Sequence, residues 1–189
     1  MSVRMPCDDS TQTARFTMTR RFVQISGRSA VVLMLAVVGS MTAAAQNPVI
    51  AVGSAAGPAG SAVDLSVDFR AGGTGVSTLQ FDLILPEGLS SPNPPVIATG
   101  SAASSAGKSA SGSIPPTGGV RVLIFGLNDN AVASGAIAFI RLNIAGGTSP
   151  GTLAVAITGI VASDPAGNNV PTSGTAGSVV VTPPPDPAP

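Results

Sequence analysis

The 189-residue sequence contains no histidine, no tryptophan and no tyrosine, and its single cysteine is Cys7. A Ser-His-Asp or Cys-His nucleophile needs residues that this chain lacks, and zinc sites built on histidine or on several cysteines are excluded for the same reason. The chain also has no GxxxxGKS/T phosphate-binding loop and no dinucleotide fingerprint that follows a strand. The enzymatic route that remains is a pair of carboxylates.

Charge is scarce as well, because nine basic and nine acidic residues together make up 10% of the chain. No basic cluster lies beyond residue 28, so we do not expect nucleic acid as a partner. Asp82 and Glu87 are the nearest candidates for a carboxylate pair, but we interpret them as solvated surface groups. Aromatic residues, which sugar-cleaving clefts use to stack sugar rings, are only 3% of the chain. We therefore predict that the protein is not an enzyme and uses no cofactor and no metal.

The first 45 residues have the layout of a secretory signal peptide (1–45). Three arginines precede an apolar run over residues 30–38: Arg20, Arg21 and Arg28. Ala43 and Ala45 then form a small-x-small pattern, which predicts cleavage between Ala45 and Gln46. The apolar run is shorter than the roughly 20 residues needed to span a bilayer. We expect the natural start to be Met18, and the processed protein to be exported to the periplasm, the cell surface or the medium without spanning a membrane.

The rest of the chain predicts an all-β fold. Glycine (23) and proline (17) are frequent in the whole chain, and beyond residue 45 short runs rich in β-branched and aliphatic residues are separated by turn residues. Nine segments have this character: 48–57, 61–70, 77–86, 96–103, 108–114, 120–127, 135–144, 151–164 and 177–182. Nine short strands with hairpin-length and longer gaps favour a two-sheet sandwich with jelly-roll topology. The Pro-rich end, residues 183–189, is expected to be an extended tail.

Alternation along the strands predicts which side chains face the core. Four inward positions are expected in 61–70 (Val63, Leu65, Val67 and Phe69) and four in 77–86 (Leu79, Phe81, Leu83 and Leu85). Residues 120–127 are apolar on both faces, which is typical of a central strand covered on each side. One cover is the opposite sheet. The other is either the segment 87–118, which we favour, or a partner protein at an exposed apolar patch; Phe139 and Arg141 raise the same question.

Four stretches, in this order, carry a resemblance to a known family. They are "GSAAGPAGSAVDLSVDF", "LQFDLILPEGL", "GVRVLIFGLNDNAVASGAIAFIRLNI" and "ASDPAGNNVP…GSVVV". They resemble the opening hairpin, the third strand, the sixth and seventh strands, and the closing hairpin of cohesin domains, the nine-stranded jelly-roll modules of bacterial scaffolding proteins. The resemblance runs from about Pro48 to Thr182 and implies a cohesin-like β-sandwich domain over residues 46–182. The alternative fold is an unrelated sandwich of the immunoglobulin or fibronectin type.

The resemblance implies a binding role, because cohesins hold dockerins, which are small calcium-binding helical modules that often tether polysaccharide-degrading enzymes. The family's docking face lies on its strands three, five, six and eight. Matched to this sequence, that face implies polar partner-binding residues at Thr78, Gln80, Asp82, Asn128 and Asp129. Leu123 and Phe125, which share one face of 120–127, are the residues we expect to supply the buried apolar area of such an interface. Thr78 and Gln80 replace the Asn and Asp familiar in cellulosomal members, and the loop after the sixth strand is shorter. The resemblance is therefore closer to the non-cellulosomal type.

Two other functions stay open at the level of the sequence. A carbohydrate-binding module would use a similar sandwich in the same compartment, although such modules usually stack sugars on Trp or Tyr. The second open function is that of a structural module of the cell envelope or matrix, with the Pro-rich tail as a spacer. Contact with polysaccharide is expected to be indirect if the cohesin-like role holds.

Overall fold

The computed structural model describes residues 46–183. The predicted signal peptide with its start at Met18 and its cleavage site after Ala45, and residues 184–189 of the tail, lie outside the described residues. The described part of the chain forms twelve strands and one short helix: β1 (Val49–Val52), β2 (Ser54–Pro58), β3 (Ala62–Arg70), β4 (Thr78–Ile84), β5 (Leu89–Ser90), β6 (Ile97–Thr99), α1 (Ser101–Ser105), β7 (Ser109–Ser113), β8 (Val120–Phe125), β9 (Gly135–Ile144), β10 (Gly151–Ser163), β11 (Ser173–Thr175) and β12 (Gly177–Thr182). None of the helical structure in this range is long and apolar enough to cross a membrane.

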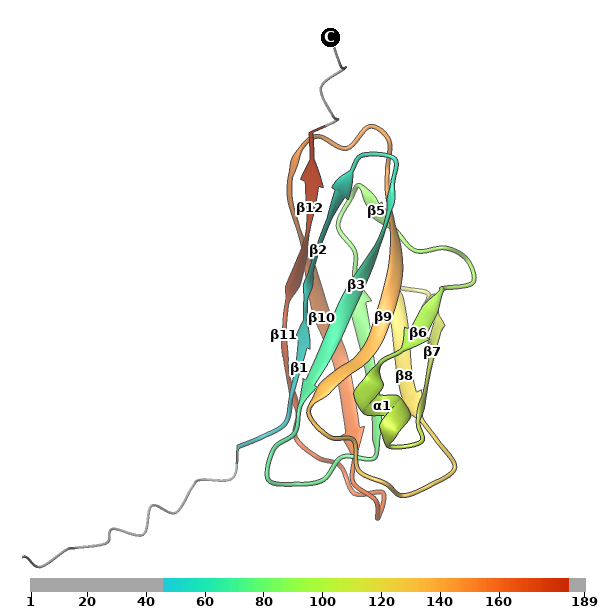
Figure 1. The fold of residues 1–189 in the computed structure, drawn as a ribbon, viewed down its shortest axis with the longest axis vertical. Helices are drawn as coiled ribbons and strands as arrows, with labels where there is room; N and C mark the ends of the chain where they lie inside the picture. Colours follow the sequence, from blue (N-terminus) through green and yellow to red (C-terminus); the bar gives the residue numbers. More distant parts are fainter. Residues whose placement is uncertain (1–45, 184–189) are drawn as a thin grey trace, which may run out of the picture. The chain divides into compact units, whose positions relative to one another are not determined.

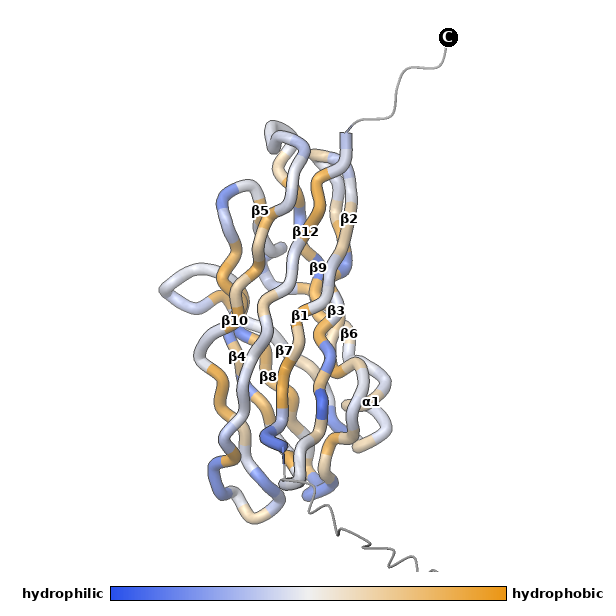
Figure 2. The backbone as a smooth tube through the Cα atoms, turned by 90° about the vertical axis from the view of Figure 1, so that its left-hand side faces the viewer, coloured by the Kyte–Doolittle hydropathy of each residue, from blue (hydrophilic) through white to orange (hydrophobic). Residues whose placement is uncertain are grey.

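The strands form two packed sheets. One has the order β11-β1-β3-β9-β5, with β6 also paired to β9, and the other has the order β2-β12-β10-β4-β8-β7. All pairings are antiparallel except β1 with β11 and β12 with β2. Figure 1 shows β3 and β9 in front of β10 and β4, and Figure 2, turned by a quarter turn, separates the two layers. The predicted all-β, two-sheet sandwich is confirmed.

Aliphatic side chains from both sheets fill the space between them. Val63, Leu65, Val67 and Phe69 of β3 are all buried, as the alternation predicts. Leu79, Phe81 and Leu83 of β4 are fully buried too, whereas Leu85, beyond the end of β4, is only half-buried. Val120, Val122 and Ile124 of β8 complete this part of the core. Burial of this apolar surface is the main term that stabilises a sandwich without disulfides.

The count of twelve strands instead of nine has local causes. The segment 48–57 is divided at Gly53, where the chain passes from one sheet to the other as β1 ends and β2 begins. A Cβ at Gly53 would clash with Ser66 Oγ and lie 3.1 Å from the Ser66 carbonyl oxygen, so a glycine lets the chain cross close to β3. The other two strands that were not predicted are the short strands β5 and β11. Neither has an alternating apolar pattern from which a strand could be predicted.

One predicted strand is partly wrong. Residues 96–103 form a strand only over Ile97–Thr99, and the chain then enters the helix α1, which buries Ala102 and Ala103. Alanine favours helices, and the run SAASSA contains no β-branched residue. Gly100 permits the change of direction, because a Cβ there would lie 2.3 Å from the carbonyl oxygen of Ala136 on β9.

Candidate functional site

Four strands present their outer side chains on one continuous face. In register across the sheet, Ser111 of β7 pairs with Leu123 of β8, Leu123 with Gln80 of β4, and Gln80 with Val161 of β10. The structure thus brings together the predicted site residues of the third and sixth expected strands, which are direct neighbours as β4 and β8. We call the outer surface of β7, β8, β4 and β10 the β8 face.

Thr78, Gln80 and Asp82 occupy successive outward positions of β4 on this face. Thr78 is exposed and Gln80 is half-buried, while Asp82 is buried to 8% exposure. Its cross-strand partner is Arg121, whose Nε donates to Asp82 Oδ1 and whose Nη2 donates to Oδ2, both at 2.7 Å. Hydrogen bonding to this guanidinium lowers the pKa of Asp82 below its ordinary value of 3.8 and raises that of Arg121. Asp82 is therefore an ionised carboxylate within a neutral pair.

Several apolar side chains share the outer face with this pair. Phe125 is 44% exposed, Val161 54% and Ile84 41%, and Leu123 is half-buried between them. Leu127, just beyond β8, is fully exposed. These exposed apolar side chains share the face with the polar side chains Thr78, Gln80 and Asp82 of β4.

No segment of residues 46–183 covers the β8 face, and the favoured cover, residues 87–118, is a wrong prediction. That segment contributes β7 to the edge of the same sheet, beside β8, and β6 to the opposite sheet beside β9. It extends both sheets sideways because its backbone donors and acceptors find partners at the strand edges. The outer side chains of β8 consequently remain open to solvent.

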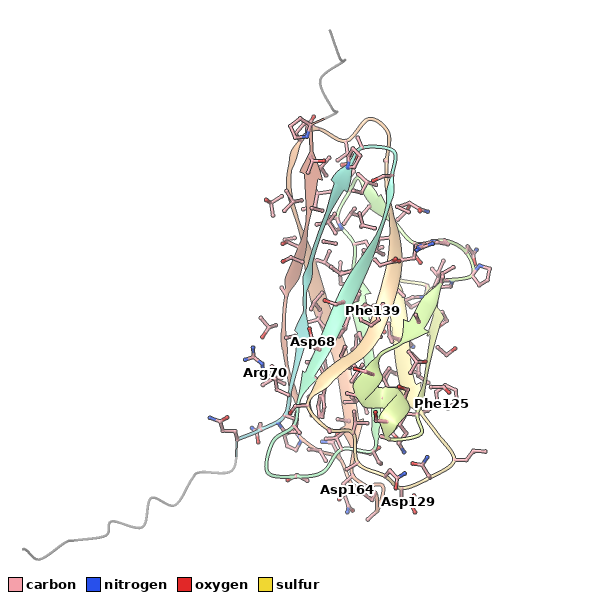
Figure 3. The ribbon with its side chains drawn as sticks, in the orientation of Figure 1. Asp68, Arg70, Phe125, Asp129, Phe139 and Asp164 are labelled. Carbon is pink, nitrogen blue, oxygen red and sulfur yellow. The ribbon has the colours of Figure 1, made fainter. Side chains whose placement is uncertain are left out.

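The loop after β8 contains the other two predicted residues, which behave differently. Asn128 is held by the chain itself: its Nδ2 donates to the carbonyl of Gly107 at 3.0 Å, and its Oδ1 accepts from the backbone N–H of Asn130 at 3.0 Å. The buried Lys108 donates from Nζ to the carbonyl oxygen of Asn128 at 2.6 Å. Asp129 is exposed, in the loop that follows β8, and lies below Phe125 in the view of Figure 3.

Three residues of this site were not anticipated from the sequence. Arg121 was visible as an outward residue of 120–127, but its pairing with Asp82 depends on the β4–β8 register. Val161 is outward because β10 contains a bulge between Thr158 and Val161. Ile84 ends β4 in the alternation already recognised, and its outward position could have been found from that pattern.

The other carboxylate of the hypothetical catalytic pair does not join Asp82. Glu87 lines a separate open hollow of about 370 Å³ with Gly88, Ala145, Gly147 and Thr148. That hollow has one titratable residue and no second acid or base. In the described range 46–183 there is also no grouping of three or more metal-ligating side chains.

The fold is that of cohesin domains. A non-cellulosomal cohesin from the hyperthermophilic archaeon Archaeoglobus fulgidus is 18% identical to this chain with a TM-score of 0.59, and the match covers 73% of this chain and 93% of that one. The cohesin of a Coh-OlpA–Doc918 complex, a type I cohesin–dockerin complex from Clostridium thermocellum, is 14% identical with a TM-score of 0.61, covering 72% of this chain and 100% of that one.

The sixth cohesin of Acetivibrio cellulolyticus scaffoldin B, solved with a Cel5 dockerin, is 19% identical with a TM-score of 0.59, covering 72% of this chain and 100% of the other. No protein-family model matches the chain, and no curated protein matches it significantly. The resemblance to cohesins predicted from four stretches of sequence is confirmed for the fold.

Proposed function

We propose that this domain is a non-catalytic protein-binding module that holds a dockerin-like partner on its β8 face. The observation that carries the proposal is the set of exposed or half-buried apolar side chains, Phe125, Val161, Ile84 and Leu123, on the face that the sequence resemblance had pointed to. The cohesin fold supports it, since some of the similar cohesins were solved in complexes with dockerins.

The chemistry of the face suits a protein partner. Phe125 and Val161 would contribute apolar area at the centre of an interface, and Gln80 and Thr78 would supply hydrogen bonds that set the register. A buried single charge would oppose binding, but Asp82 and Arg121 already neutralise and hydrogen-bond each other. Asp129, exposed at the rim, is suited to contact a basic group of the partner.

The same ion pair argues against catalysis by Asp82. A general acid at neutral pH needs a raised pKa, whereas Arg121 lowers the pKa of Asp82. The module would act by tethering alone.

Secretion and a link to polysaccharide breakdown follow as further parts of the proposal. They rest on the signal-peptide pattern of residues 1–45 and on the dockerin partners of cohesins, which often carry polysaccharide-degrading enzymes. Under this proposal the domain works outside the cytoplasm and positions a partner enzyme through its β8 face.

Calorimetry on the full chain tests the proposal, with dockerin-like modules encoded in the source genome as ligands, in calcium and again in EDTA. Wild type should bind at least one module in calcium and lose it in EDTA, because dockerins need calcium to fold their loops. Phe125→Asp and Gln80→Arg should each weaken binding by roughly tenfold or more, as expected when a charge enters an interface core.

Phe139→Asp is the matched control, because Phe139 is also an exposed phenylalanine, 38% against 44% for Phe125, but lies on the opposite sheet. Thermal unfolding of each variant verifies folding. If no module binds wild type, the dockerin proposal is wrong. If Phe139→Asp abolishes binding and Phe125→Asp does not, the partner is real but the assigned face is wrong.

A further inference from the structure

The outer surface of the opposite sheet has its own hollow. It measures about 330 Å³ and is lined by Asp64, Val96, Ala98, Phe139 and Arg141, from β3, β9 and the segment that contains β6. This volume is near the lower end of the roughly 300–1,000 Å³ found for small-molecule sites. Figure 3 shows Phe139 on β9 and Phe125 on β8, so the hollow and the β8 face belong to different sheets.

Phe139 stands open because its neighbours are small. Across the strands it pairs with Ser66 on β3 and with Ala98 on β6. Neither side chain is long enough to cover an aromatic ring, and 38% of Phe139 remains exposed. The result is an aromatic platform with apolar Val96 and Ala98 beside it.

A bidentate ion pair borders this platform. Arg141 donates from Nε to Asp64 Oδ1 at 2.9 Å and from Nη2 to Oδ2 at 2.8 Å, and both side chains are about half exposed. The guanidinium keeps N–H groups that Asp64 does not use, and each carboxylate oxygen keeps a free lone pair. Side by side, the pair offers hydrogen-bond donors and acceptors without net charge.

The combination selects among classes of ligand. A charged ligand gains little here, because each charge of the pair is already neutralised. A purely apolar ligand, including an aliphatic protein side chain, would strip water from Asp64 and Arg141 and return no hydrogen bonds. A hydroxylated ring replaces those water contacts, since each hydroxyl both donates and accepts, and its C–H face packs on an aromatic ring.

We propose that the hollow at Phe139, Asp64 and Arg141 is a binding site for a neutral sugar, with the pyranose ring lying on Phe139 and its hydroxyls bonded to the ion pair. The site is independent of the β8 face. A protein partner on one sheet and a saccharide on the other could be held at the same time, which would give the module direct contact with a polysaccharide.

Titration of the full chain with soluble oligosaccharides, followed by NMR and calorimetry, tests the site. The probes are cellohexaose, xylohexaose and mannohexaose, with an oligogalacturonate as the anionic comparison, each raised to about 10 mM because single-platform sites bind weakly. At least one neutral probe should bind. Phe139→Ala and Arg141→Met should each weaken it by about tenfold or more, while Phe125→Ala leaves it unchanged.

The proposal is overturned if no neutral probe binds wild type in this range, if only the oligogalacturonate binds, or if Phe139→Ala binds as well as wild type. It is overturned also if Phe139→Ala instead weakens capture of a protein partner, since the hollow would then belong to a protein interface. The Phe125→Asp variant, which should lose dockerin binding, should still bind the sugar. The dockerin proposal and the sugar proposal can therefore fail independently. Unfolding curves of both hollow variants check that they are folded.

Discussion

Arg121 of β8 and Asp82 of β4 are directly opposed in the sheet and joined by two hydrogen bonds of 2.7 Å, and the pair lies on the two inner strands of the β8 face. The other ion pair among residues 46–183, Asp64 with Arg141, has the same bidentate form on the opposite sheet. The two differ in exposure, because the Asp82 side chain is 12% exposed and that of Asp64 is 51%. This contrast makes the second pair a natural reference for the first.

Double-mutant cycles should therefore give unequal coupling energies. One cycle replaces Asp82, Arg121 or both by alanine, and the other does the same at Asp64 and Arg141. We expect the coupling energy, measured from free energies of unfolding, to be larger for the Asp82–Arg121 pair. Water and salt screen the exposed pair more strongly. Chemical denaturation at low and high salt measures both, and equal couplings would contradict the structural difference.

The Asp82 pair also predicts an acid-dependent loss of stability. Arg121 lowers the pKa of the Asp82 carboxyl in the folded protein. The ion pair therefore stabilises the folded state fully at pH values above the ordinary carboxyl pKa of 3.8. That stabilisation is lost as the pH falls through the lower folded-state pKa. The difference in free energy of unfolding between wild type and Asp82→Asn should stay constant from neutral pH down to about 4 and shrink below it. A difference that grows on acidification would show the opposite sign of the pKa shift.

Gly159 holds the bulge of β10 in a conformation that an L side chain resists. Its φ is +59°, and an added Cβ would lie 3.1 Å from Asp82 Oδ2. Gly159→Ala should destabilise the fold by about 1–2 kcal/mol through the left-handed conformation, with an added cost if Asp82 shifts. Gly146→Ala, where nothing lies within 4 Å of the added Cβ, should be close to neutral. Thermal or urea unfolding of the two variants gives the comparison.

We expect Asn128 to have a structural role and its neighbour Asp129 to have a binding role. Asn128→Ala removes the hydrogen bond that Asn128 Nδ2 donates to the Gly107 carbonyl and the one that Asn128 Oδ1 accepts from the Asn130 N–H. We expect the free energy of unfolding to fall by about 1–2 kcal/mol. Asp129→Ala removes an exposed carboxylate and should change stability by less than about 0.5 kcal/mol. Only Asp129→Ala should alter the salt dependence of partner association without altering unfolding. Equal unfolding curves for both variants would contradict the role given to Asn128.

Much of the β8 face could be predicted because a strand obeys local rules. Side chains alternate between the two faces, so Thr78, Gln80 and Asp82 had to share a side, as did Leu123 and Phe125. The same rule identified the core positions of β3. Backbone geometry alone, acting over neighbouring residues, decides these relations, and the sequence by itself was sufficient for them.

Tertiary structure decided the rest. Strict alternation from Val155 would place Val161 in the core, but the extra residue at the Gly159 bulge reverses the phase, so Val161 is 54% exposed and Ala162 is buried. Asp82 gained its partner only through the register of β4 with β8, and residues 87–118 extended the sheet edges instead of covering β8. Phe139 stands open because its cross-strand neighbours Ser66 and Ala98 are small, and both come from strands far from it in the chain. Strand pairing depends on which distant segments can form hydrogen bonds with each other and fill the space between the sheets. A local sequence pattern does not determine this.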